Sequence, residues 1–537
     1  MLRSLRLLLV ATLVPLVGQG QVPMIGDDAT VPAPGTARIT LIPTAGSYDR
    51  RYSRSGDGTL EPLGSDFGVV GLERVPSRLV AQDEIRTLAG IPDLTLTLGD
   101  LDVRLHGQVE QLPLKLELGL PGRISLGVMV PFVRTRSTVV VGPGIGAGAT
   151  AGLNPAINTP AALSQNTALV TALSQAAEAL RNRLDQCAGS SAPDCASVNA
   201  DRNATAAFAT NADAFRDNLE HVYFFSAFVP VTATPAEQAI AARIAALRSQ
   251  FESFGVNAMT GAPARPVGAA PMTYGDLQAV LTDPVVGISS DPLVTAERVA
   301  LGDMEVGARI VLLDAIGRTP RAAGLRVALG GLVRLGTGMV PPTRSLISIG
   351  TGDGQTDIEG HAIVDAALGR WFAMTLAARY TRQLEHDTPM RIPEFAGQPF
   401  ILADRAALVR RDLGDMLQLE ATPRIALNEF FAVGGYFSHR RKGADSHSLA
   451  AASDESVEVV LDPAVLDEGT EIREQRMGVG VAFSNLAAFN RGRSRFPFEL
   501  SFLHVQTTGA SGGMIPRMRE DRVQVRLYTP VWRRLRN

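Results

Sequence analysis

The sequence predicts an all-β protein, a transmembrane antiparallel β-barrel with a helical insertion in one long loop. Three observations lead to this prediction: an apolar leader at the N-terminus, apolar and polar residues that alternate with a period of two, and short connections that alternate with long ones. The chain has 537 residues and a formal net charge of −3. Its basic residues are dispersed, which does not favour nucleic acid as a partner.

Residues 1–20 have the composition of a secretory signal peptide. Two arginines precede an apolar run from Leu7 to Val17, and small residues follow as far as Gly20. This run is too short for a membrane-spanning helix, and no cysteine follows it to accept a lipid. We therefore predict cleavage near Gly20 and export of the mature chain.

The alternation is clearest between residues 357 and 383. From Asp357 onward the odd positions carry three acids and a histidine, while the even positions are mostly apolar. After a turn at Gly369 and Arg370 the alternation resumes as far as Tyr380. A period of two is the signature of a strand whose faces meet unlike surroundings. This stretch is therefore interpreted as a hairpin with one apolar face and one charged face.

Similar segments recur along the chain and predict about twelve strands, an even number typical of single-chain barrels, with fourteen as the alternative. The predicted strands are 93–107, 109–120, 122–136, 302–314, 321–338, 355–369, 371–384, 412–427, 429–441, 472–485, 493–508 and 519–533.

The connections between these strands alternate in length. The long connections are 137–301, 339–354, 385–411, 442–471 and 509–518. Outer-membrane barrels have tight turns on the periplasmic side and longer loops outside. A soluble sandwich has no reason to sort its connections in this way, so we favour the barrel. A large soluble sheet packed on one face is the alternative.

The charged face of each strand should line the lumen. If it faced lipid instead, each Arg or Lys near the bilayer midplane would cost about 2–4 kcal/mol. These charges would set the field of a pore, hold a plug, or pair with one another. The lumen-lining candidates are Arg326, Arg334, Glu359, Asp365, Arg379 and Glu420.

Two segments lie outside the predicted strands. Residues 21–90 are rich in Pro, Gly and charge, and are expected to form either a plug in the barrel or a periplasmic segment. The remainder, 91–537, is assigned to the barrel. Within it, 137–301 is a long extracellular insertion, and 160–255 has helical composition and apolar spacing. This insertion either covers the outer mouth or is an addition without that role.

The only two cysteines, Cys187 and Cys195, lie close together in a polar stretch of this insertion. In an exported protein such a pair favours a local disulfide, with free thiols as the alternative. No histidine lies near them, so we predict no metal site. The seven histidines are scattered, and no arrangement of residues predicts catalysis or a cofactor.

A family resemblance adds to this interpretation. The segments LGDMEVGARIVLLD (301–314), LRVALGGLVRLGTG (325–338) and TGDGQTDIEG (351–360) resemble an outer-membrane transporter group. LPGRISLGVMVPFVRTR (120–136) similarly resembles a hairpin of that group. The group includes the FadL-type fatty-acid channels and the barrels of phenol-degradation pathways. The resemblance implies a monomeric barrel that passes small hydrophobic molecules.

The sequence therefore predicts a porin-like transport barrel in the outer membrane of a diderm bacterium. It would contact outer-membrane lipid and pass small hydrophobic solutes without chemical turnover. The alternative is a structural or surface-interaction barrel with a closed lumen, whose helical loop binds a partner.

Overall fold

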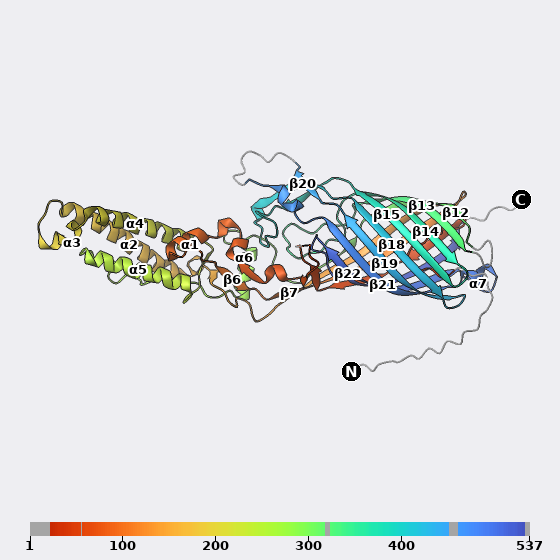
Figure 1. Cartoon of the computed structure of the whole chain (residues 1–537), viewed down its shortest axis with the longest axis horizontal. Coiled ribbons are helices and arrows are strands. Elements are labelled where there is room, and N and C mark those ends of the chain that lie inside the picture. The colour runs from red at the N-terminus through yellow and green to blue at the C-terminus, as the bar shows by residue number, and fades with distance from the viewer. Residues whose placement is uncertain (1–21, 55, 317–322, 451–459, 532–537) are drawn as a thin grey trace, which may run out of the picture.

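The computed structural model describes residues 22–54, 56–316, 323–450 and 460–531. The predicted signal peptide, residues 1–20, lies outside the described residues. The chain is elongated, with a β-barrel at one end and a group of helices at the other (Figure 1). No helix in the described ranges is long and apolar enough to cross a membrane.

One antiparallel sheet of fourteen strands closes on itself. Its strands are β1 (Thr36–Leu41), β2 (Thr44–Tyr48), β7 (Val103–Leu120), β8 (Ile124–Val141), β11 (Ala296–Leu301), β12 (Met304–Asp314), β13 (Gly324–Leu335), β14 (Asp357–Leu368), β15 (Phe372–Gln383), β18 (Met416–Ala426), β19 (Phe431–Lys442), β21 (Ile472–Ser484), β22 (Phe498–Ser511) and β23 (Arg519–Pro530). Closure follows because β1 and β2 pair with β7 on one side and with β23 on the other.

The barrel wall has twelve strand positions, which are called staves here. β1 and β2 lie end to end beside β7, and β11 and β12 lie end to end beside β8, so each of these two pairs makes one stave of the fourteen-stranded sheet. Closure removes the exposed sheet edges that invite aggregation. The predicted fold class, a closed antiparallel barrel, is confirmed.

The first stave differs from the predicted one. The sequence predicts separate strands at 93–107 and 109–120, but the structure has a single strand here, β7, with β6 (Thr97–Asp100) outside the barrel. The stave made of β1 and β2 supplies the missing strand. Its alternation is interrupted at Pro43, which has no N–H for the sheet ladder. The barrel therefore begins at Thr36, before the boundary predicted at residue 91.

The two ends of the barrel differ. At the short-turn end, neighbouring staves are joined by connections such as 121–123, 369–371 and 427–430. At the long-loop end the connections carry structure of their own. β16 (His386–Arg391), β17 (Ala406–Asp412) and β20 (Ser446–Leu449) form a small sheet there.

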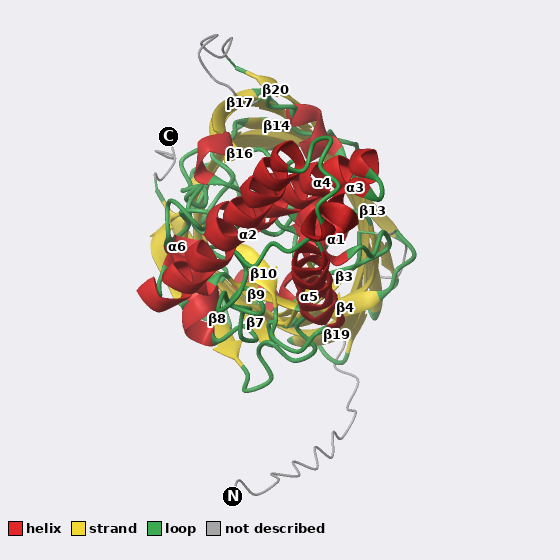
Figure 2. Cartoon of the chain, turned by 90° about the vertical axis from the view of Figure 1, so that its left-hand side faces the viewer, coloured by secondary structure: helices red, strands yellow, loops and turns green. Residues whose placement is uncertain are grey.

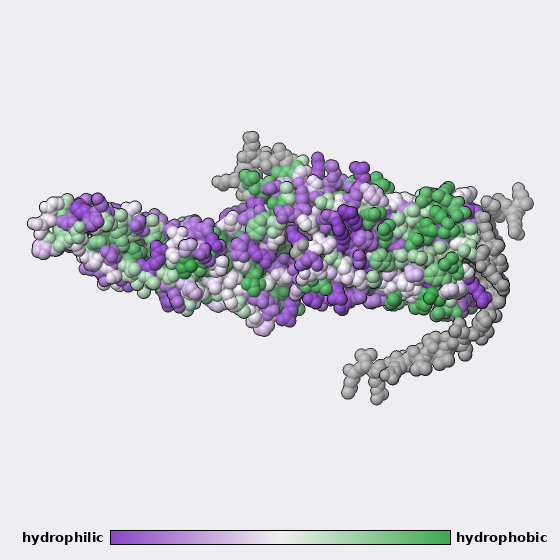
Figure 3. All heavy atoms as spheres, in the orientation of Figure 1, coloured by the Kyte–Doolittle hydropathy of each residue, from purple (hydrophilic) through white to green (hydrophobic). Residues whose placement is uncertain are grey.

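The two faces of the wall have opposite polarity. On β14 and β15, Asp365 is 1% exposed and faces inward, whereas Leu376 is 47% exposed and faces outward. Apolar side chains form green patches on the outer surface of the barrel (Figure 3). Exposed apolar residues on the staves include Leu112, Leu114, Leu116, Leu126, Val128, Phe132, Val306, Ile310, Leu329, Val333, Ile358, Leu417, Leu419, Phe437, Met477, Val479, Val481, Leu500, Phe502 and Leu527. This surface is typical of a barrel that contacts lipid.

A helical extension continues beyond the long-loop end (Figure 1). Its helices are α1 (Gln82–Ala89), α2 (Pro160–Gln186), α3 (Ala196–Asn199), α4 (Arg202–Glu220), α5 (Pro235–Ser253) and α6 (Tyr274–Thr282). Most belong to the insertion between β8 and β11, and α1 comes from the segment before β7. The two 18-residue strands β7 and β8 pair over their whole length and lead toward this extension. Figure 2 shows α2, α4 and α5 in front of the barrel strands.

The extension has an ordinary apolar core. Leu173, Leu180, Ile240, Ile244 and Phe251 are among its fully buried side chains. The helices form because their sequences are rich in alanine and other strong helix formers. Apolar residues recur on one side of each helix, so the helices bury them against one another.

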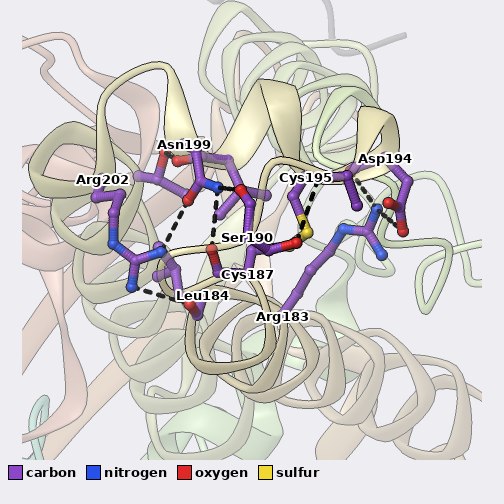
Figure 4. Close-up of a disulfide and its surroundings, with 11 residues drawn as sticks. Arg183, Leu184, Cys187, Ser190, Asp194, Cys195, Asn199 and Arg202 are labelled. Atoms are coloured by element: carbon purple, nitrogen blue, oxygen red, sulfur yellow. Dashed lines mark hydrogen bonds and ion pairs between the residues drawn. A yellow bond between two sulfur atoms is a disulfide. The ribbon is translucent and has the colours of Figure 1, made fainter.

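The far tip of the extension is held by a disulfide between Cys187 and Cys195, whose Cα atoms are 5.4 Å apart (Figure 4). Asn199 Nδ2 donates hydrogen bonds to the carbonyl oxygens of Cys187 and Ser190, both at 2.9 Å. Arg202 Nη2 donates to Leu184 O at 2.9 Å. The disulfide and these bonds connect the end of α2 to the start of α4.

Candidate functional site

Residues 22–34, here called the inner segment, run inside the barrel. Val22 packs on Ala373 and Ala432, which lie beside turns of the short-turn end. Ile25 packs farther along the wall, in a cluster with Leu503. The segment then returns toward the same end, where Gly35 N donates to the carbonyl oxygen of Gly119 at 2.9 Å and β1 begins.

The turn of the inner segment is made by Gly26, whose φ of 76° is readily adopted only by glycine. Asp27 follows directly and binds two arginines of the wall. Arg379 Nη2 donates to Asp27 Oδ2 at 2.7 Å, and Arg309 Nη2 donates to the same oxygen at 3.1 Å. One carboxylate therefore ties the inner segment to β12 and to β15.

Asp28 and its neighbours bind the wall elsewhere. The Arg526 guanidinium pairs with the Asp28 carboxylate, and Arg526 Nη2 donates to Gly26 O at 2.7 Å. Ala29 N donates to Asp365 Oδ2 at 3.0 Å. Thr30 Oγ1 accepts a bond from Arg38 Nη1 at 2.8 Å. Contacts from β1, β14 and β23 thus converge on three consecutive residues of the inner segment.

Three of the predicted lumen residues meet around Arg379. Its Nη1 donates to Glu359 Oε1 at 3.2 Å, and its Nε lies 3.7 Å from Glu420 Oε2. Glu420 also accepts a hydrogen bond from the hydroxyl of Tyr436 at 2.9 Å. Since Arg379 also binds Asp27, these predicted residues form one network with the inner segment.

The other three predicted residues do not contact Arg379, although Asp365 binds the inner segment at Ala29. Arg326 is paired with Asp314 at 3.2 Å and lies 3.9 Å from Asp365, nearer the short-turn end. Arg334 lies toward the long-loop end, where it contacts Glu305 and Asp357, each at 3.0 Å. The six residues share the inward face of the wall, but the structure divides them into three sets.

Charge pairing is common inside the barrel, although the fully buried Arg424 has no hydrogen-bond partner among the described residues. Arg38 Nε is 2.7 Å from Glu117 Oε2, and Arg476 Nη2 is 2.6 Å from Glu520 Oε2. Breaking a buried pair by removing one partner leaves an uncompensated charge, which is strongly destabilising. Removing Asp27 or Asp28 would therefore leave the arginines that bind the inner segment without these carboxylates and would destabilise the barrel.

Three cavities lie along the barrel axis. A cavity of about 210 Å³ lies in mid-lumen and is lined by Gly26, Asp27 and charged residues of the wall. A cavity of about 790 Å³ lies at the short-turn end and is lined by residues 30–34. The inner segment thus lies between these two. The third, about 540 Å³, lies at the long-loop end beside Val109 and Val133.

The sequence pattern revealed only part of the set that holds the inner segment, namely Arg379 and Asp365. Asp27, Asp28, Arg38 and Arg309 were not among the candidates. The available signal was a pair of adjacent acids soon after the leader, in a stretch otherwise poor in charge. Among the described residues, no group of three or more His, Cys, Asp and Glu side chains is arranged to hold a metal ion.

No family model and no curated protein matches this sequence. Among solved structures, an outer membrane channel from Pseudomonas putida F1 has 8% identity and a TM-score of 0.42, covering 94% of this chain and 100% of that one. A FadL homologue of Pseudomonas aeruginosa has 7% identity and a TM-score of 0.24, covering 93% and 90%. The monoaromatic hydrocarbon channel CymD has 7% identity and a TM-score of 0.25, covering 93% of this chain and 89% of that one. These identities and TM-scores are too low to transfer a function. The barrel is established by the hydrogen bonds between the strands of this chain.

Proposed function

We propose that this protein is an outer-membrane channel that passes small hydrophobic solutes without chemical turnover. The observation that carries the proposal is a closed barrel with an apolar outer surface and a charged lumen occupied by the inner segment. In this proposal the short-turn end faces the periplasm and the long-loop end faces outward, as in other bacterial barrels. The protein acts as a monomer in contact with outer-membrane lipid.

The inner segment is the plug of this channel. It fills the lumen between the mid-lumen cavity and the cavity at the short-turn end. Asp27 and Asp28 hold it to arginines from three staves. The segment is not part of the hydrogen-bonded wall, so it can leave the lumen without unfolding the wall once water or solute replaces its ionic contacts. Solute passage would require such a displacement.

The choice of a hydrophobic solute is supported by the cavity at the long-loop end. Its lining combines valines, prolines and Met390 with polar residues and with the charged Asp353, Arg391 and Arg411. Ligand sites are usually concave and largely apolar, with a few polar groups that orient the ligand. The resemblance of residues 301–360 to FadL-type transporters points to the same class of solute.

Two measurements test the proposal. Membrane-extracted protein should run faster on a denaturing gel when unboiled, because a closed barrel resists detergent until it is heated. Liposomes containing the protein should then take up a neutral monoaromatic compound faster than protein-free liposomes do, with a smaller increase for a sugar of similar mass. A periplasmic, soluble protein with no gel shift would contradict the barrel in the membrane. A gel shift with an equal increase in the uptake of both solutes would contradict only the hydrophobic solute.

The predicted lumen residues can be tested in the same assay. Arg326→Ala and Arg379→Ala should each alter permeation or ion selectivity, since each leaves carboxylates of the lumen unpaired. A matched control is Arg216→Ala on α4, where the arginine pairs with Asp217 far from the barrel. Unchanged flux and selectivity in both lumen variants would remove these residues from the site.

The alternative is a barrel with a permanently closed lumen, whose helical extension binds a partner. The observation that favours it is that the extension leads away from the barrel (Figure 1). Deleting residues 160–255 separates the possibilities. Increased leak would mean that the extension gates the channel, whereas lost partner binding with unchanged permeability would mean that it is a docking module.

A further inference from the structure

Two arginines face outward at the long-loop end of β19 and β21. Arg441 and Arg473, here called the arginine pair, are direct cross-strand partners. Their side chains are 60% and 58% exposed. Along the same outward face, the next pair toward the short-turn end is His439 with Gln475, and the one after it is Phe437 with Met477. On these two strands the outward face therefore changes from apolar to polar to cationic over four residues, while the β18 residue opposite Arg441 is the exposed Leu417.

This change marks a depth in the membrane. At about 3.3 Å per residue, four residues span about 13 Å along a strand. With the tilt of about 40° that is typical of such barrels, this is about 10 Å along the membrane normal. Arginine side chains also extend away from apolar surroundings toward polar ones. The guanidinium groups thus lie at headgroup level when Phe437 and Met477 lie in the hydrocarbon.

The arginine pair is short of negative charge. Both guanidinium groups contact a single oxygen, Glu471 Oε1, at 3.3 Å and 3.4 Å. Like charges directly opposite on neighbouring strands repel each other, so one shared carboxylate leaves an excess positive charge. Beyond β18, Arg382 on β15 is also exposed, and Asp415 accepts a hydrogen bond from the Tyr380 hydroxyl.

The opposite arrangement occurs elsewhere on the same rim. Arg134 on β8 also lies toward the long-loop end and is 45% exposed. It contacts two carboxylates, Glu110 at 3.4 Å and Glu297 at 3.0 Å. One cation with two anions has no capacity left for a further anion. Arg134 is therefore the matched control for the arginine pair.

We propose that the arginine pair binds the phosphate groups of the phosphorylated glycolipid in the outer leaflet. Guanidinium groups bind phosphate oxygens through paired, charge-assisted hydrogen bonds. Two of them side by side, at headgroup level and short of anions, match a lipid with phosphates on its head. The inference rests on the outer-membrane placement proposed above, and is independent of the solute and of the plug.

The test uses the full-length protein in detergent and measures how much lipid A binds to it, by native mass spectrometry over a range of lipid A concentrations. Arg441→Gln with Arg473→Gln should raise the apparent Kd about tenfold, because both charge-assisted contacts are lost. Arg134→Gln should bind like the unmodified protein. Removing the phosphates from lipid A should weaken binding to the unmodified protein by a similar factor.

Each outcome has one meaning. Equal binding by the double variant and the unmodified protein would overturn the inference, and so would equal binding of lipid A with and without phosphates. If millimolar inorganic phosphate competes with lipid A, the arginine pair is a general anion site and the inference of a lipid site is overturned. Each variant is first checked for the heat-modifiable band. If the unmodified protein lacks that band, the proposed function fails; if the band is present and lipid A binding is unselective, only this inference fails.

Discussion

The barrel and the helical extension arrange the same kinds of residues in opposite ways. In the extension Leu180 is fully buried, and polar side chains face outward. In the barrel Leu376 is 47% exposed, while Asp365 is 1% exposed. The extension follows the rule for a protein in water, whereas the wall of the barrel follows the rule for a protein in lipid. The two regions of the chain therefore bury opposite kinds of side chain. The change occurs where β7 and β8 leave the barrel.

The difference also changes what holds each region together. Burial of apolar side chains stabilises the extension, at about 1.5–3 kcal/mol for a fully buried leucine. Inside the barrel, most buried arginines pair with carboxylates, and removing one partner of such a pair is costly. Substitutions should therefore act differently in the two regions.

The sharpest test places the same new charge in both regions. Leu180→Arg puts a charge into the apolar core of α2 and should cost about 4 kcal/mol or more, unfolding the extension. Leu376→Arg puts it on the lipid side of β15 and should cost about 2–4 kcal/mol. Urea unfolding in vesicles, followed by circular dichroism for the helices and by gel shift for the barrel, separates the two. A Leu376→Arg barrel as stable as the unmodified one would refute the lipid-facing assignment.

Removing the anchor of the inner segment should have the next largest effect. Asp27→Ala leaves Arg309 and Arg379 without this carboxylate, which should cost about 3 kcal/mol. Single-channel conductance in planar bilayers should rise severalfold, because the inner segment loses its contacts with β12 and β15 and leaves the lumen more often. Asp83→Ala on α1, where the carboxylate pairs only locally with Arg86, is the control. Identical conductance in the two variants would mean that the segment does not obstruct the lumen.

Loss of the disulfide should affect only the extension. Cys187→Ser with Cys195→Ser opens a loop with a sequence separation of 8 and should lower the stability of the helices by about 2.5 kcal/mol. Thermal melting of the helical signal reports this loss, and solute flux reports the barrel. A change in flux would contradict the independence of the two regions.

The smallest effect is expected for Arg334→Ala. This arginine lies toward the long-loop end and is 26% exposed, so water partly screens its pair with Glu305, whereas its other partner, Asp357, is buried. The stability cost should be about 1 kcal/mol. Reversal potentials across a salt gradient should show a modest shift toward cations, since Glu305 and Asp357 lose their partner. A stability loss as large as that of Asp27→Ala would show that exposure does not weaken these pairs.

The staves of the barrel could be predicted from the sequence because their period is local. Asp365 and Leu376 were assigned to opposite faces by alternation alone, and the structure agrees. The first stave could not be predicted in this way, because β1 and β2 are short and Pro43 separates them. Residues 93–107 misled the prediction because alternation continues on both sides of the break between β6 and β7.

The site is harder to predict because its partners are remote in the sequence. Asp28 binds Arg526, which is 498 residues away, and Asp27 binds Arg379, which is 352 residues away. Periodicity identifies inward-facing charges such as Arg379, but it does not say which acid each one meets. Only the closed wall brings these residues together with the inner segment.

The contact between Asp28 and Arg526 has a consequence for how the protein folds. Arg526 lies on β23, the stave that closes the barrel by pairing with β1. Until that stave is in place, one anchor of the inner segment does not exist. Contacts of such long sequence separation form late and make folding slow. Closing the wall and seating the inner segment therefore become a single late step, so a membrane would not have to tolerate a finished barrel that is still open.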